Sequence, residues 1–82
     1  MVKIKIELFG PLTKIGNKFI EVEIPLNGVT VKELKRIISR KSLLLKRNIH
    51  SIAVVKNDEI VTDNEKITQK DTLSLLPPVS GG

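Results

Sequence analysis

The residues best suited to chemistry stand at the end of the chain, in the run Pro77-Pro78-Val79-Ser80-Gly81-Gly82. Glycine has no Cβ, so Gly81 and Gly82 can lie extended in a channel too narrow for any side chain. The two prolines fix φ and favour a semi-rigid extended spacer. We therefore expect residues 77–82 to be a tail that inserts into a partner enzyme and presents the carboxylate of Gly82 for activation. A frayed terminus is the alternative interpretation.

The chain has few other side chains that could bind a metal or act as a nucleophile or base. The chain has no cysteine, which excludes disulfides, thiolate nucleophiles and cysteine metal sites. The single histidine, His50, cannot form a zinc site or a proton relay alone, and we expect it in a loop or on the surface. No glycine-rich phosphate loop or nucleophile elbow is present. We expect no metal site and no cofactor bound by this chain.

Length and composition are those of one small folded domain. The chain has 82 residues, of which 40% are hydrophobic and 28% charged, a balance typical of a globular protein. The longest apolar run is the three leucines of residues 43–45, far short of the ~20 residues needed to span a membrane. The N-terminus alternates like a strand and has no signal-peptide block. We expect a cytoplasmic protein without a membrane partner, divided into a domain of residues 1–76 and the tail of residues 77–82.

Charge is unevenly distributed along the chain. Residues 31–47 contain seven basic side chains and one acidic side chain, a local net charge of +6. A basic segment can bind nucleic acid or an acidic protein surface. The alternative is the solvated face of an amphipathic helix. We favour this alternative, because the chain has no Tyr or Trp and only two Phe on which bases could stack, and we expect no nucleic-acid partner.

Two strands and a helix are predicted in the first half. Residues 2–8 and 19–24 alternate apolar and polar side chains, the period of a half-buried strand. Antiparallel pairing of Ile4 with Val22 also places Lys3 opposite Glu23, so the charges support the register. The sequence Thr30-Val31-Lys32-Glu33 is a capping box, and apolar residues at helical spacing predict a helix from about 31 to 46.

Three shorter strands are predicted in the second half, over residues 51–56, 59–61 and 72–76, with polar turns between them. The order β-β-α-β-β-β, with one main helix against one face of a mixed sheet, indicates an α+β fold in which the first and last strands lie side by side. In outline this is the ubiquitin-like β-grasp.

Several segments carry a resemblance to a known family. Residues 75–82, Leu-Leu-Pro-Pro-Val-Ser-Gly-Gly, are similar to the Phe-Phe-Pro-Pro-Val-Thr/Ser-Gly-Gly ending of the molybdopterin synthase small-subunit family. Weaker matches are residues 8–12, residues 52–57 and Asp71 ahead of the last strand. The chain therefore resembles the MoaD/ThiS ubiquitin-like sulfur carriers, including the more distant carriers of thiamine synthesis.

The resemblance implies a function for the tail. An adenylating enzyme of the ubiquitin-activating type, using ATP and Mg, would convert Gly82 to an acyl adenylate. A sulfur donor of the desulfurase or rhodanese type would then leave a thiocarboxylate on Gly82. The large subunit of molybdopterin synthase would transfer that sulfur to a cyclic pterin precursor. The chain would be non-catalytic alone, acting as small subunit and sulfur-donating cosubstrate.

Three points stay open on the sequence. Phe9, Phe19 and Leu76 are expected on the open face of the sheet as partner-docking residues, although Phe9 and Phe19 could instead pack under a loop. The chain could be a ubiquitin-like modifier that is joined through Gly82 to lysines. It could also carry sulfur for thiamine synthesis or tRNA thiolation.

Overall fold

The fold is a mixed sheet with helices on one side, described by a computed structural model for residues 1–15 and 17–77. Its first half contains β1 (Val2–Leu8), the 3₁₀ helix η1 (Gly10–Ile15), β2 (Phe19–Ile24), β3 (Val29–Thr30), α1 (Val31–Ser39) and α2 (Leu43–Asn48). Its second half contains β4 (Ala53–Lys56), β5 (Glu59–Val61), β6 (Lys66–Ile67) and β7 (Leu73–Leu76). No helix in the described part of the chain is long and apolar enough to cross a membrane.

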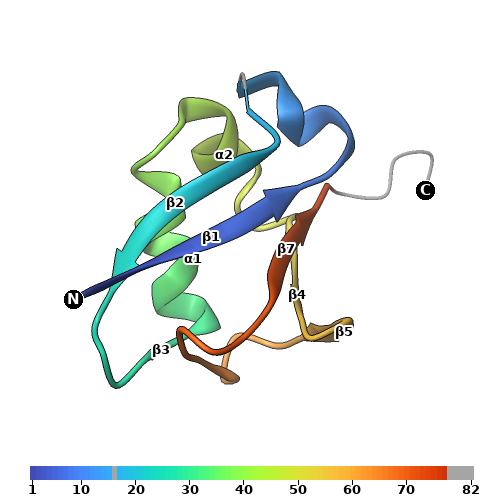
Figure 1. The fold of residues 1–82 in the computed structure, drawn as a ribbon. Helices are drawn as coiled ribbons and strands as arrows, with labels where there is room; N and C mark the ends of the chain where they lie inside the picture. The colour runs from blue at the N-terminus through green and yellow to red at the C-terminus, as the bar shows by residue number, and fades with distance from the viewer. Residues whose placement is uncertain (16, 78–82) are drawn as a thin grey trace.

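The main sheet has five strands in the order β2-β1-β7-β4-β5, and the predicted proximity of first and last strands is confirmed. β1 and β7 run parallel, whereas the other neighbours in this sheet are antiparallel. α1 and α2 lie together on one side of this sheet, and β7 lies at its centre (Figure 1). β3 and β6 form a separate two-stranded ladder that the sequence did not predict.

The β1–β2 hairpin has the predicted register. Ile4 pairs with Val22, and Lys3 pairs with Glu23 on the opposite face of the sheet. Opposite charges across a ladder add modestly to the burial of the apolar face, and a slip by one residue would expose that face. The alternation of apolar and polar residues in the two strands therefore determines which face of the sheet the helices cover.

The core lies between the sheet and the two helices. Its side chains come from almost every element, and every buried residue in the described part of the chain is apolar. Six apolar positions on the inner face of β1, β2 and β7 are all buried: Ile4, Ile6, Leu8, Val22, Leu73 and Leu75. An apolar core without buried polar groups avoids the desolvation cost of unpaired donors and acceptors.

The prediction of one helix from 31 to 46 is wrong in one respect, because the helix breaks at residues 40–42. The capping box forms as predicted, with Thr30 accepting from the Glu33 amide. α1 then ends at Ser39, and Ser42 adopts an extended conformation with φ −157° and ψ 137°. The Ser42 hydroxyl accepts from the Leu44 amide at 3.2 Å, so Ser42 begins a second helix instead of continuing the first.

The three consecutive leucines at the start of α2 differ in how far they are buried. Leu45 is fully buried and Leu44 half-buried, whereas Leu43 is 61% exposed. Leu43 therefore faces away from the core.

We expect Gly28→Ala to lower the free energy of unfolding by roughly 2–3 kcal/mol. Gly28 has a φ of +93°, and a Cβ there would lie 2.5 Å from the Ile67 carbonyl oxygen, a backbone atom that cannot move aside. Urea denaturation would measure the loss.

Gly10→Ala is the matched control for this substitution. Gly10 also has a positive φ, of +56°, but a Cβ there would lie 3.4 Å from Pro77 Cγ, an ordinary contact. We expect a loss of about 1 kcal/mol from the backbone conformation alone. Equal losses for the two variants would show that the close approach to Ile67 contributes nothing.

Candidate functional site

The parallel pairing of β1 with β7 determines where the predicted tail begins. Its last aligned pair joins Leu8 to Leu75, and both side chains are buried. Leu76 ends β7, and Pro77, which cannot donate to a ladder, follows it. The predicted reactive residue Gly82 and the tail residues Pro78, Val79, Ser80 and Gly81 lie outside the described residues. The described part of the site is therefore the root of the tail.

A short 3₁₀ helix lies beside this root. β1 ends at Leu8, and Gly10 takes a positive φ that turns the chain into η1. The Leu12 amide donates to the Phe9 carbonyl at 3.2 Å, and the Thr13 hydroxyl donates to the Gly10 carbonyl at 2.8 Å. Since Gly10 lies against Pro77, the turn at the end of β1 packs on the first residue of the tail. The sequence did not predict this short helix.

The sheet face away from the helices carries several apolar side chains, with the charged residues Lys3, Lys5 and Glu7 of β1 among them. The predicted docking residues Phe9 and Phe19 are 40% and 43% exposed, so they do not pack under a loop. Leu76 is half-buried and pairs with Ala53 of β4. We call Phe19 and Leu76, together with the half-buried Val55 and the exposed Ile60, the open sheet face, whereas Phe9 follows β1 directly and belongs to no strand. Exposed apolar side chains gathered on one sheet surface are typical of a protein interface.

Sequence reasoning missed two members of this surface. Ile60 is 69% exposed in β5 and lies opposite Val55 of β4 in the antiparallel register. The sequence predicted residues 59–61 as a return strand but not the register of the pair, and without the register neither residue could be assigned to a face. An isolated isoleucine between Glu59 and a half-buried Val61 was the available signal.

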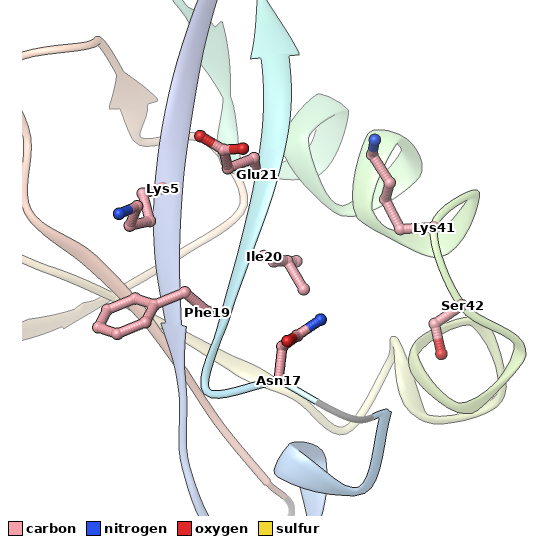
Figure 2. Close-up of a pocket in the computed structure, with 7 residues that line it drawn as sticks. All are labelled: Lys5, Asn17, Phe19, Ile20, Glu21, Lys41 and Ser42. Carbon is pink, nitrogen blue, oxygen red and sulfur yellow. The ribbon is translucent and has the colours of Figure 1, made fainter.

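A hollow of about 630 Å³ lies at the β2 edge of the sheet, between β2 and the connection from α1 to α2 (Figure 2). Asn17 and Ile20 line it from the β2 side, and Lys41 and Ser42 line it from the helical side. Of the three predicted docking residues only Phe19 borders it, and Lys5 Nζ lies 5.5 Å from the centre of the Phe19 ring. This cation–π contact holds the ring on the open sheet face.

Two turns at the opposite end of β7 are joined by a polar contact. Asn57 has a left-handed φ of 51°, and its side-chain amide donates to Asp71 Oδ1 at 3.0 Å while its Oδ1 accepts from the Thr72 amide at 2.9 Å. The other Asp71 oxygen accepts from the Thr68 amide at 2.8 Å. We call the contact between Asn57 and Asp71 the turn latch. It holds the start of β7 against the β4–β5 turn.

Electrostatics strengthen this end of the molecule. Partial burial raises the pKa of Asp71, but the hydrogen bonds from Thr68 and Asn57, together with the charge of Lys56, outweigh it and lower that pKa. The hydrogen bond from Lys56 to Glu65, with an N–O distance of 2.8 Å, raises the pKa of Lys56. The ionised forms of both groups are therefore the forms that the fold stabilises.

Metal-binding chemistry finds no support in the described ranges. Within residues 1–15 and 17–77 no three side chains of His, Cys, Asp or Glu gather as they would around a metal ion. His50 is exposed in the turn after α2, as predicted.

The fold is that of a recognised class. A mixed sheet with two helices on one face, and parallel first and last strands at its centre, is the ubiquitin-like β-grasp. A putative molybdopterin converting factor subunit 1 from Pyrococcus furiosus has this fold, with a TM-score of 0.79 and 23% identity over 96% of this chain and 100% of its own.

Two further solved structures are more similar in sequence. Small archaeal modifier protein 1 (SAMP1) from Haloferax volcanii is 26% identical over 99% of this chain and 100% of its own, with a TM-score of 0.78. A complex of subunits 1 and 2 of molybdopterin-converting factor from Helicobacter pylori contains a chain that is 29% identical, with a TM-score of 0.65 over 99% and 100%.

The family follows from the sequence match. The ThiS family model matches residues 6–82, so the chain belongs to the ThiS family, and the resemblance to MoaD/ThiS sulfur carriers is confirmed. No curated protein matches the chain closely enough to serve as a relative.

We expect Asp71→Asn to lower the free energy of unfolding by about 1 kcal/mol at pH 7 and to change it much less at about pH 3. The folded state lowers the pKa of Asp71, so its stabilisation is present above the unfolded pKa and is lost as pH falls through the folded pKa. Urea denaturation at both pH values measures this difference.

Glu59→Gln, at an exposed position of β5, is the control and should change stability little at either pH. An equal loss for Asp71→Asn at both pH values would show that the shape of the side chain, rather than its charge, stabilises the turn latch.

Proposed function

We propose that the chain is a sulfur carrier of molybdopterin synthesis, with the carboxylate of Gly82 as its reactive group. The observation that carries the proposal is the ending Pro-Pro-Val-Ser-Gly-Gly, which begins directly after the central strand β7 and lies within the family match up to residue 82. In this proposal residues 1–76 bind the partner, and residues 77–82 extend into the partner's active site.

The chemistry proceeds in three steps on the partners. A carboxylate oxygen of Gly82 attacks the α-phosphorus of ATP, pyrophosphate leaves, and a mixed anhydride with AMP forms on an adenylating enzyme that holds the Mg. The outer sulfur of a donor-protein persulfide then attacks the acyl carbon, AMP leaves, and the persulfide proton goes to solvent, which gives an acyl disulfide. A second thiol on the donor cleaves this acyl disulfide, and that thiol and the first donor cysteine are oxidised to a disulfide. The product is a thiocarboxylate on Gly82.

The large subunit of molybdopterin synthase is the proposed acceptor partner. The Helicobacter pylori structure holds subunits 1 and 2 of molybdopterin-converting factor in one complex, which supports a partner of this kind. The open sheet face would dock on it, since Leu76 on this face directly precedes the tail. The tail would then deliver the sulfur of Gly82 to the cyclic pterin precursor.

Protein modification is the second candidate function. Its support is the 26% identity to small archaeal modifier protein 1 over the whole chain. In this role the acyl adenylate of Gly82 would react with a lysine ε-amine instead of sulfur, and AMP would again leave. Recovery of peptides with Gly82 joined to lysine from cell lysates would favour it. The same fold could also serve thiamine synthesis or tRNA thiolation.

We expect the intact mass of the protein to rise by about 16 Da, as sulfur replaces one acyl oxygen, after incubation with MgATP, the adenylating enzyme and a sulfur donor. A variant that lacks Gly82 should gain no mass and release no AMP. A mass gain in that variant, or no gain in the wild type, would falsify the carrier proposal.

We expect Leu76→Glu to weaken binding to the large subunit at least about 10-fold, since a charge would be buried at the centre of the docking surface. Isothermal titration calorimetry with the purified large subunit measures the effect.

Leu26→Glu introduces the same charge at a residue that is 66% exposed in the loop after β2, and we expect it to bind like the wild type. Unchanged binding of Leu76→Glu would remove the open sheet face from the proposal. Thermal unfolding of both variants separates a docking defect from a folding defect.

A further inference from the structure

A second surface, on the helical side of the molecule, has a composition unlike that of the open sheet face. A hollow of about 610 Å³ lies where α1 meets α2. We call it the basic hollow, and it is lined by Arg36, Ser39, Arg40, Lys41, Ser42, Leu43 and Lys46. Four of these seven side chains are cationic, two are hydroxyls and none is acidic.

The break in the helix creates this surface. A single amphipathic helix over residues 31–46, as predicted, would carry its basic residues along a convex solvated face. Instead the chain turns at residues 40–42 and restarts at Ser42, so the C-terminal part of α1 and the start of α2 line one concavity. Figure 2 shows Lys41 and Ser42 on this connection. The cations are thereby gathered around a hollow rather than spread along a rod.

The cations of the basic hollow are available to a ligand. Arg36, Arg40, Lys41 and Lys46 are all exposed. In the described part of the chain the two salt bridges join Lys35 to Asp63 and Lys56 to Glu65, and neither involves a residue of the hollow.

A second hollow continues this surface along α1. Its volume is about 320 Å³, and it shares Arg36 and Ser39 with the first. Its one acid, Asp63, accepts a hydrogen bond from Lys35 at 3.1 Å. The positive surface therefore extends from Lys46 to Lys32.

The composition of the lining favours phosphates over other anions. Two of the four cations are arginines, whose planar guanidinium groups bind phosphate oxygens in pairs. An acidic protein partner would need a desolvated apolar or aromatic centre, and the hollow offers only Leu43. Neither of the two exposed aromatic residues, Phe9 and Phe19, lines it.

The kind of nucleic acid follows from what the lining lacks and contains. No aromatic side chain is present for stacking on single-stranded bases. Ser39 and Ser42 supply two hydroxyl groups that can hydrogen-bond to 2′-hydroxyls, the groups that distinguish RNA from DNA. Double-helical RNA is recognised mainly by shape and by contacts to its phosphates and 2′-hydroxyls, which need no base stacking. We propose that the basic hollow binds the phosphate backbone of double-helical RNA.

The proposal is independent of the carrier function. The basic hollow is built from the helices, which lie on one side of the sheet, whereas the open sheet face is on the other (Figure 1). The two surfaces meet only at the β2 edge, where Lys41 and Ser42 line one hollow together with Phe19, whereas Arg36, Arg40 and Lys46 line the basic hollow and not that one. Deletion of Gly82, which abolishes sulfur loading, should leave RNA binding unchanged.

The test is the salt dependence of binding to an RNA duplex of about 16 base pairs, measured by fluorescence anisotropy of the full chain. Four phosphate contacts predict a slope of log K against log salt of about −3.6, or a loss of about 100-fold between 50 and 200 mM salt. The triple variant Arg36→Gln, Arg40→Gln and Lys46→Gln should bring the slope to about −0.9.

A matched variant controls for net charge. Lys3→Gln, Lys66→Gln and Lys70→Gln remove three charges from exposed lysines outside both hollows and should leave the slope unchanged. An equal reduction in this control, or no binding by the wild type at 50 mM salt, would overturn the proposal. So would equally tight binding of a DNA duplex of the same sequence, or equal displacement of RNA by polyglutamate, which would indicate an acidic protein partner.

Discussion

The parallel ladder between β1 and β7 is the constraint on which the rest of the structure depends. A parallel pair cannot be closed by a tight turn, so the chain must cross over the sheet through the helices before β7 can form. That crossover places the helices on one face, buries Leu8 and Leu75 beneath them, and leaves the other face free. It also makes the last described strand the central one, so the root of the tail is held by strands on both sides.

Each end of β7 is fixed by a separate device. At its start the turn latch joins Asn57 to Asp71, and at its end Pro77 packs against the turn at Gly10. An element with only four residues gains little from its own ladder bonds, so these contacts define where it begins and stops. For the proposed carrier function a fixed starting point is an advantage, since each unfixed residue at the root of the tail would add to the conformational entropy lost on insertion.

The parts that could be predicted from the sequence are those set by residue type at short range. Alternation and opposite charges gave the β1–β2 register, and the capping box gave the start of α1. The end of α1 was not predicted. The Ser42 hydroxyl binds a backbone amide that a continuous helix would use, and whether it does so depends on tertiary packing. The β3–β6 ladder has only two residue pairs, too few for a periodic pattern in the sequence. Ile60 could be assigned to a face only once the register of β4 with β5 was known. The chemistry proposed for the tail depends on glycine and proline themselves and needs no packing information.

The two edge strands of the sheet carry a consequence for behaviour in solution. A protein with exposed apolar side chains and unpaired strand edges can pair its edge strands with those of other copies and so aggregate. β5 is only three residues long, and β2 carries Glu21 and Glu23 on its exposed positions. Short length and charge at the two open edges discourage strand addition, so the apolar face can remain available to partners without self-assembly. The same exposed glutamates that pair with lysines of β1 thereby act as gatekeepers against fibre growth.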